Sequence, residues 1–232
     1  MLDPLQATRC LALCAHPDDE TLGVGGILAA LGDRGCRVHV AIYTQGGQGY
    51  ADLAERDRIR TIRAEEVKAA LGVLGVPSHE FLGFEDMAVP RDRGALHKTI
   101  EVIRRIRPDV IFAHHEGDLH PDHQAVAALA VQAWFLAHRP LALELGEPWR
   151  AQALFHFEVL HPFTPTHIVD ITAQYERVRE AFRRYKSQHA VIPHTFQHLD
   201  GLTALRGAAI GATRGQGLVQ SFRMPQRLEI KL

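Results

Sequence analysis

Two short stretches combine histidine with carboxylate residues in a pattern that suits a metal ion. They are His16–Glu20 (HPDDE) and His120–His123 (HPDH). Imidazole nitrogens and carboxylate oxygens bind zinc, and on ligand type alone iron(II), manganese and cobalt also fit. Two histidines and one carboxylate leave positions on the metal open for water and substrate, which is typical of a catalytic site. The two stretches together predict a metal-dependent hydrolase.

The two aspartates of the first stretch cannot easily share one role, because consecutive side chains point in different directions. One of Asp18 and Asp19 is therefore expected to bind the metal, while the other accepts a proton from the bound water as general base. His120 is suited to stabilise an oxyanion or to protonate a leaving amine, and Asp122 can bond its ring. The alternative is that both aspartates only cap a helix.

Alternating strand-like and helix-like segments must position these residues. Buried apolar runs predict strands, and apolar residues at helical spacing predict helices. In the first part of the chain the expected strands are 9–15, 37–43, 80–82 and 109–113, and the expected helices are 20–34, 53–74, 93–106 and 121–138. This order predicts an α/β fold with a Rossmann-like open, mostly parallel sheet and helices on both faces.

Each histidine-containing stretch follows a predicted strand and opens a predicted helix. In open α/β sheets, ligands bind outside the carboxyl ends of the strands, where the strand order reverses. If strands 9–15 and 109–113 are neighbours, both stretches reach one crevice. A proline after each leading histidine restricts the backbone, and Pro121 suits the first position of a helix.

The part of the chain after residue 150 has a different pattern. Strands are expected at 153–160, 167–171 and 227–231, and a helix at 173–187. We expect these elements to extend the same sheet and to cap the site. The chain is thus expected to form one domain, residues 1–232, with a core of residues 1–150 and a C-terminal α/β extension of residues 151–232.

Composition and charge argue against several classes of protein. The chain has 232 residues, of which 46% are hydrophobic, and its formal charge is -1, so nothing favours nucleic acid or an anionic membrane as partner. No apolar run approaches the roughly 20 residues that span a bilayer, and no signal-peptide pattern is expected. Cys10, Cys14 and Cys36 are expected to pack in the core of a cytoplasmic protein.

Several segments resemble the PIG-L/LmbE-like family of zinc-dependent de-N-acetylases. The resemblance is carried mainly by residues 11–20 (LALCAHPDDE) and by His120–His123. Weaker matches follow elsewhere in the chain: Thr44–Gly47, Arg63–Glu66 with Leu71–Gly72, Leu82–Asp86 and Lys186–Gln188. The late segment Val219–Phe222 departs from the family pattern because it lacks a glutamate, which weakens any substrate contact inferred there.

The resemblance implies roles for individual residues. Three residues would bind Zn²⁺: His16, Asp19 and His123. Asp18 would be the general base, and His120, oriented by Asp122, would stabilise the oxyanion or act as acid. Arg63 and Asp86 match positions that contact the polar part of the substrate. The implied reaction removes an N-acyl group, above all N-acetyl, from an amino sugar or a related small polar glycoside, and the implied assembly is a homo-oligomer, trimeric or hexameric.

Two other functions stay open on the sequence alone. The glycines at positions 46, 47 and 49 and the acidic stretch weakly favour a metal-dependent phosphoesterase, although no P-loop lysine follows them. A non-catalytic binding module could keep the fold and the metal, but every expected ligand, acid and base is present. Outside the two stretches, His114 and His115 stand at the end of a predicted strand, where a place near the site is one alternative, but the expectation is that they are solvated loop residues.

Overall fold

A seven-stranded sheet forms the centre of the computed structural model, which describes residues 6–76 and 78–221. The strands are β1 (Arg9–Cys14), β2 (Arg37–Thr44), β3 (Ser78–Phe84), β4 (Val110–His114), β5 (Ala153–Phe157), β6 (His167–Asp170) and β7 (Gly215–Gln220). Their order across the sheet is β3-β2-β1-β4-β5-β7-β6. In this order, neighbouring strands among β3, β2, β1, β4 and β5 pair in parallel. The strand β7 is antiparallel to both of its neighbours, β5 and β6. The predicted α/β fold with a mostly parallel sheet is confirmed.

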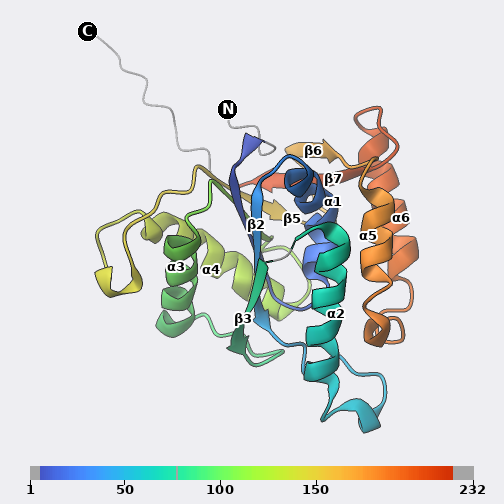
Figure 1. Cartoon of the computed structure of the whole chain (residues 1–232), viewed down its shortest axis with the longest axis horizontal. Coiled ribbons are helices and arrows are strands. Elements are labelled where there is room, and N and C mark those ends of the chain that lie inside the picture. Colours follow the sequence, from blue (N-terminus) through green and yellow to red (C-terminus); the bar gives the residue numbers. More distant parts are fainter. Residues whose placement is uncertain (1–5, 77, 222–232) are drawn as a thin grey trace.

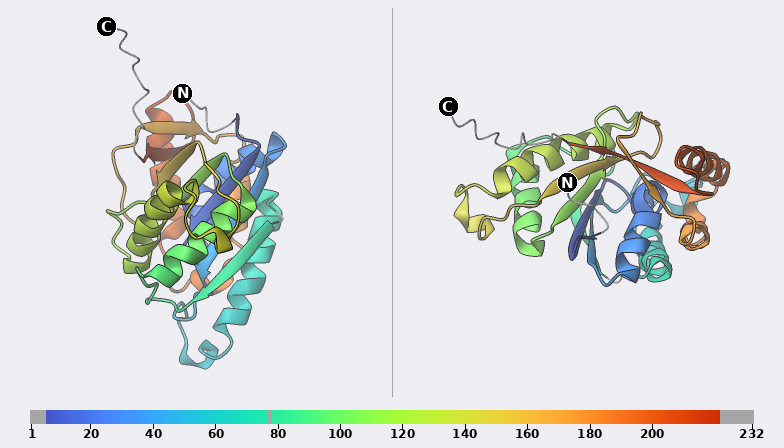
Figure 2. Two further views of the ribbon diagram at one scale, coloured as in Figure 1. Left: turned by 90° about the vertical axis from the view of Figure 1, so that its left-hand side faces the viewer. Right: turned by 90° about the horizontal axis from the view of Figure 1, so that it is seen from above.

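Helices cover both faces of this sheet (Figures 1 and 2). They are α1 (Asp19–Asp33), α2 (Ile59–Leu74), α3 (Arg93–Ile106), α4 (Pro121–Ala137), α5 (Tyr175–Phe182) and α6 (Thr195–Ala208), with short 3-10 turns at Leu53–Glu55, Leu143–Leu145 and Lys186–Gln188. In Figure 1, α3 and α4 lie on one face, and α1, α2, α5 and α6 lie on the other. None of the helices in the described ranges has the length and apolar character needed to cross a membrane.

The core is divided by the sheet into two layers, as the alternation of side chains along a strand requires. On β1, Cys10, Ala12 and Cys14 pack under the layer of α1, α2 and α5, whereas Leu11 and Leu13 pack under α3 and α4. The three cysteines are buried and free, in agreement with the expected packing role. Because β1 is buried on both faces, it is a continuous apolar run in the sequence.

The direction of the chain through the sheet reverses between β1 and β4. From β1 the chain runs outward to β2 and β3, and it then returns to place β4 on the other side of β1. The segments that leave the carboxyl ends of β1 and β4 therefore turn to opposite faces and leave a crevice between them. Both histidine-containing stretches begin at this crevice.

The C-terminal part continues the same sheet, as expected, but with elements that the sequence did not reveal. The helix α6 and the strand β7 were not predicted, and the helix predicted over 173–187 ends at Phe182. Glycine disfavours both helix and strand, and β7 contains Gly215 and Gly217. A Cβ atom at Gly215 would lie 2.9 Å from the backbone nitrogen of Gly207 and 3.0 Å from the backbone carbon of Arg206, so the packing of α6 against β7 requires glycine there. The strand predicted at 227–231 lies outside the described residues.

Candidate metal centre and active site

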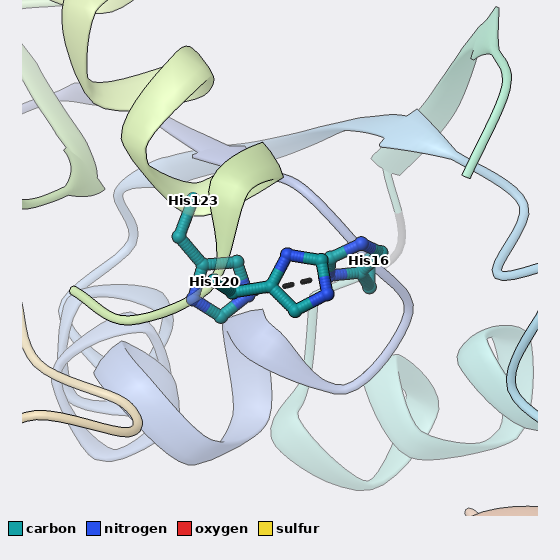
Figure 3. Close-up of side chains that lie close together, drawn as sticks. All are labelled: His16, His120 and His123. Atoms are coloured by element: carbon teal, nitrogen blue, oxygen red, sulfur yellow. Dashed lines mark hydrogen bonds between the residues drawn. The ribbon is translucent and has the colours of Figure 1, made fainter. Parts of the chain in front are cut away.

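The two histidine-containing stretches meet at the crevice beside β1 and β4. His16 lies on the turn between β1 and α1, His120 is the N-cap residue of α4, and His123 lies in the first turn of α4. Their rings point toward one another in Figure 3, with His16 Nδ1 3.2 Å from His123 Nε2. Because β1 and β4 are neighbours, the predicted convergence of the two stretches is confirmed.

Asp19 completes a triangle of donor atoms with two of these rings. Its Oδ2 lies 3.6 Å from His16 Nδ1, and its Oδ1 lies 3.3 Å from His123 Nε2, so each carboxylate oxygen faces one of the two rings. Donor atoms about 2.0–2.2 Å from a tetrahedral zinc ion are separated by about 3.4 Å, so these spacings fit one ion. The three side chains of the triangle are buried. Nitrogens of His16, His120 and His123 also lie close enough together to share a metal, so His120 is a further candidate ligand.

The carboxylate of Asp122 determines which nitrogen of His16 is free. Asp122 Oδ2 lies 3.0 Å from His16 Nε2, and the same carboxylate accepts the backbone N–H groups of Met87 and Val89. Asp86 Oδ1 lies 3.1 Å from the same nitrogen. Burial raises the pKa of Asp86, but the contact with His16 outweighs burial and lowers this pKa to about 2. With Nε2–H donating to a carboxylate, the ring keeps Nδ1 free to bind a metal.

The predicted pairing of Asp122 with the His120 ring is wrong. His120 folds back on the start of α4, and its Nδ1 accepts the backbone N–H of Asp122 at 3.2 Å, whereas the Asp122 carboxylate bonds His16. Because Nδ1 accepts this hydrogen bond, the neutral His120 ring carries its hydrogen on Nε2. Burial first, and then the neighbouring His16 and His123, lower the pKa of His120, which favours the neutral ring.

A buried carboxylate that the sequence reasoning missed supports His123. Asp118 Oδ1 lies 3.0 Å from His123 Nδ1, and Asp118 also accepts the N–H groups of His120 and Leu160. Although burial opposes it, the Asp19 and Asp118 carboxylates raise the pKa of His123 to about 9. The signal in the sequence was an aspartate placed two residues before the second His-Pro pair.

Asp18 lies beside the donor triangle in a strained backbone conformation. Its φ of 106° is in the left-handed region, and its side chain makes no capping hydrogen bond to α1. The carboxylate instead accepts a hydrogen bond from the Arg63 guanidinium at 3.1 Å. Burial raises the pKa of Asp18 to about 7, with Arg63 opposing the rise and Asp19 adding to it. Helix capping therefore does not account for Asp18.

Glu20 fixes the backbone of Asp18 from inside the protein. Glu20 is fully buried, and its Oε2 accepts the backbone N–H of Asp18 at 3.1 Å. Its Oε1 accepts the hydroxyl groups of Thr21 and Tyr185. Burial raises the pKa of Glu20. Since Tyr185 follows α5, the C-terminal part of the chain contributes directly to the support of the site.

A pocket of about 220 Å³ opens beside the donor triangle. Most of the site residues predicted from the sequence border it: His16, Asp18, Asp19, Arg63, Asp86, His120 and His123. The remaining one, Asp122, lies behind His16 and contacts it. The other lining residues come from α1, the loop after β2, the segment after β3, the segment after β5 and the segment before α6: Leu22, Gln48, Gly49, Met87, Val159, Leu160, Gln188, Val191 and Ile192.

Comparison with known proteins identifies the family. The sequence pattern of the family described as PIG-L: GlcNAc-PI de-N-acetylase matches residues 11–134, a range that includes both His-Pro pairs. The chain belongs to the PIG-L family. The resemblance stated from the two stretches is thereby confirmed.

Curated relatives of this PIG-L family member include sugar deacetylases. The 1D-myo-inositol 2-acetamido-2-deoxy-alpha-D-glucopyranoside deacetylase 1 of Catenulispora acidiphila is 32% identical over 182 residues, which cover 66% of this chain and 56% of the relative. Diacetylchitobiose deacetylase of Thermococcus kodakarensis is 30% identical over 191 residues, which cover 78% of this chain and 70% of the relative. The chain spans less than two thirds of the length of several curated relatives that it matches.

Solved structures share the fold over nearly the whole chain. N,N'-diacetylchitobiose deacetylase from Pyrococcus horikoshii aligns with a TM-score of 0.86 at 26% identity, over 93% of this chain and 84% of that one. The 4-carboxy-2-hydroxymuconate hydratase GalB from Pseudomonas putida KT2440 aligns with a TM-score of 0.83 at 23% identity, over 95% and 99%. The second likeness shows the fold alone, so the function of this PIG-L family member has to be argued from its site.

His114 is a buried neighbour of the candidate metal centre in this PIG-L family member, and its expected place in a solvated loop is wrong. It is the last residue of β4, and its Nε2 lies 3.0 Å from Asp19 Oδ2. Its ring stacks on that of His123, with 3.9 Å between centroids. Burial above all lowers the pKa of His114 to about 4, so the ring is neutral near pH 7. The predicted strand ended one residue too early to include it.

The glycines of the loop after β2 leave room for Arg63. A Cβ atom would lie 2.4 Å from Arg63 Nη1 at Gly46, where φ is 64°, and 2.3 Å from it at Gly49. Arg63 is buried, and its guanidinium donates to the carbonyl oxygen of Pro17 and to Asp18. The packing of Arg63 accounts for Gly46 and Gly49, and a Cβ atom at Gly47 would lie 2.7 Å from Arg60 Nε, so these glycines no longer favour a phosphate site.

Proposed function

We propose that this protein is a zinc-dependent hydrolase that removes an N-acyl group, N-acetyl in the simplest case, from an amino sugar. The observation that carries the proposal is the triangle of His16 Nδ1, the Asp19 carboxylate and His123 Nε2, whose spacings of 3.2, 3.6 and 3.3 Å fit one tetrahedral ion. The triangle faces a pocket that Asp18 and His120 also border. A bound zinc ion would supply a water of lowered pKa and polarise the amide carbonyl.

Asp18 is the proposed proton carrier. Its pKa, raised by burial to about 7, suits a group that accepts and returns a proton near neutral pH. It would take a proton from the attacking water as the new C–O bond forms, and deliver it to the nitrogen as the C–N bond breaks. The products are a carboxylate and a free amine. Arg63, 3.1 Å away, holds the Asp18 carboxylate in position.

His120 is the proposed donor to the negative charge that develops on the carbonyl oxygen. Its Nδ1 is occupied by the backbone N–H of Asp122, so the neutral ring offers Nε2–H. The lowered pKa of His120, caused first by burial, supports a neutral donor rather than a cation. A hydrogen bond aimed at the developing charge stabilises the transition state more than the substrate.

An amino sugar is the proposed substrate class because the similar deacetylases of Catenulispora acidiphila and Thermococcus kodakarensis carry acetamido-sugar and diacetylchitobiose substrates in their names. In this chain, Arg63 and Asp86 are among the polar residues that line the pocket. The backbone N–H of Gln48 donates to Asp86 Oδ2 at 2.8 Å and leaves Asp86 Oδ1 beside His16. We propose that Arg63 and Asp86 orient the sugar.

The test is amide hydrolysis by protein that has been stripped with a chelator and reloaded with zinc. Equimolar free amine and acetate are expected from a panel of N-acetylglucosamine glycosides. Asp18→Asn should lower kcat by a factor of about 10² to 10⁴, as expected for loss of a general base. Asp57→Asn is the control, because the Asp57 side chain is 89% exposed and is not among the residues that line the pocket. Full activity of Asp18→Asn would refute the mechanism.

The other functions considered from the sequence make different predictions in the same assay. Release of phosphate from simple phosphate esters, without amide hydrolysis, would favour a phosphoesterase. Zinc binding without turnover of any N-acyl glycoside would favour a non-catalytic binding module and overturn the proposed function. A trimeric or hexameric assembly and a cytoplasmic location stay predictions, and the mass of the protein in solution tests the first.

A further inference from the structure

A second cavity, of about 300 Å³, lies next to the metal pocket. It is lined by the start of α1, the segment after β5, the segment before α6, and α6 with β7. The surface of its lining is mostly apolar, and on α6 it includes Leu199, which is buried, and Leu202, which is half-buried. The proposed reaction does not use this cavity.

The two cavities share one wall. The residues that line both are Leu22, Val159, Leu160 and Ile192. At this shared wall Leu160 is 45% exposed, so its side chain is accessible to an occupant of either cavity. Arg63 and Asp86 line the metal pocket but not the second cavity. The metal pocket therefore combines charged groups with an apolar border that it shares with the second cavity.

Most polar groups around the second cavity are already engaged. His198 Nε2 lies 2.9 Å from the carbonyl oxygen of Val159, and the Thr203 hydroxyl donates to the carbonyl oxygen of Leu199 at 2.7 Å. Glu158 forms an ion pair with Arg206 on α6. An occupant of this cavity would meet methyl and methylene groups for the most part, so an alkyl chain suits it better than a sugar.

We propose that the second cavity receives the acyl chain of the substrate, so that the protein removes N-acyl groups longer than acetyl from an amino sugar. The inference rests on the proposed function, because it requires the amide at the donor triangle and the sugar toward Arg63 and Asp86. The acyl end then points to the wall formed by Leu22, Val159, Leu160 and Ile192. Hydrolysis adds water across the C–N bond and yields a medium-chain carboxylate and the free amino sugar.

The first experiment measures kcat/KM for one methyl glucosaminide that carries N-acetyl, N-butyryl, N-hexanoyl or N-octanoyl. The value is expected to rise with chain length, by up to about fourfold for each buried methylene. A second measurement needs no turnover: titration calorimetry compares acetate with octanoate as ligands of the zinc-loaded protein. Octanoate is expected to bind at least about tenfold more tightly, in line with the same gain per methylene.

Two tryptophan variants on α6 locate the effect. Leu202→Trp fills the cavity and should reduce the ratio of kcat/KM for the octanoyl over the acetyl substrate. Leu205→Trp is the control on the same helix, because Leu205 is 62% exposed and is not among the cavity lining, so it should keep the ratio of the unchanged protein. The chain-length series on the unchanged protein does not depend on either variant.

The outcomes separate this inference from the proposed function. Hydrolysis of the acetyl substrate with kcat/KM falling as the chain lengthens would overturn the acyl pocket and leave the deacylase function intact. A gain with octyl N-acetylglucosaminide, but not with the N-octanoyl sugar, would assign the cavity to the other end of the substrate and also overturn it. Tight octanoate binding without hydrolysis of any amide would refute the proposed function, and with it the acyl assignment.

Discussion

His16 Nε2 and Asp122 Oδ2 lie 3.0 Å apart, and this contact joins the turn after β1 to the first turn of α4. Asp122 is held from behind by the backbone N–H groups of Met87 and Val89, at 2.7 and 3.0 Å. Although burial opposes it, the hydrogen bond with His16 and these N–H groups lower the pKa of Asp122, so the carboxylate stays charged. The contact leaves His16 Nδ1 as the nitrogen that faces Asp19.

Replacing Asp122 should therefore weaken metal binding. Asp122→Asn is expected to reduce zinc affinity by roughly 10- to 100-fold, because the ring of His16 loses the carboxylate that orients it. Competition with a chromogenic chelator measures the change, and Asp57→Asn should leave the affinity as it is. If Asp122→Asn lowers kcat while zinc affinity stays constant, Asp122 acts on another group and this assignment is wrong.

Replacing Gly46 should damage both stability and activity. Gly46 has a positive φ, and Gly46→Ala places a Cβ atom 2.4 Å from the Arg63 guanidinium. Gly35 also has a positive φ, of 82°, but the Cβ atom of Gly35→Ala would have no atom within 4 Å. Both variants should lose about 1 kcal/mol of unfolding free energy from backbone strain. Only Gly46→Ala should also lower kcat, because Arg63 can no longer hold Asp18. Urea unfolding and steady-state kinetics test the pair, and equal kcat losses in both would contradict this role.

Acid should remove a stabilising contribution from Glu80 on β3. Glu80 accepts a hydrogen bond from His39 at 2.9 Å and contacts Arg105 at 2.5 Å. Together these contacts outweigh burial and lower the pKa of Glu80 from its usual 4.5 to about 2. A carboxyl whose pKa is lower in the folded state stabilises the protein above its unfolded pKa, and this contribution disappears as the pH falls toward 2.

Glu80→Gln isolates this contribution from the other carboxylates. Near pH 6 the variant should unfold with a free energy lower by about 1 kcal/mol or less, because the side chain is partly exposed. The difference from the unchanged protein should shrink steadily between pH 4.5 and pH 2. Urea unfolding of both proteins across this range measures it, and a difference that does not vary with pH would exclude the ion-pair explanation.

The central sheet could be predicted because parallel strands buried on both faces must be continuous apolar runs. The strand predicted at 9–15 corresponds to Arg9–Cys14, and the helix predicted at 93–106 has the same bounds in the structure. The C-terminal elements could not be predicted in the same way. In β7, Gly215 is required by the closeness of the α6 backbone at Gly207, and such a tertiary contact leaves no local pattern.

In the site, too, the sequence predicted residues that lie close together along the chain but not residues that are placed by packing. The two His-Pro stretches were recognisable because their residues are close in sequence, and the structure brings them together. Asp122 was assigned to His120 for the same reason, but residues two apart at a helix start point in different directions, and Asp122 reaches His16 instead. The places of His114 and Asp118 depend on packing against Asp19 and His123, which local sequence does not specify.

The hydroxyl of Tyr185 should act on the reaction through Glu20, which holds the backbone N–H of Asp18. Tyr185→Phe is expected to lower kcat by about tenfold, equal to about 1.4 kcal/mol, while KM and zinc affinity change little. The unfolding free energy should fall by about 1.5 to 3 kcal/mol, the usual loss for a hydrogen bond to a charged group. Tyr175→Phe is the matched control, since Tyr175 donates to Asp200 away from the pocket. It should lose stability without losing kcat, and a similar loss of kcat in both variants would mean that Tyr185 contributes only to stability.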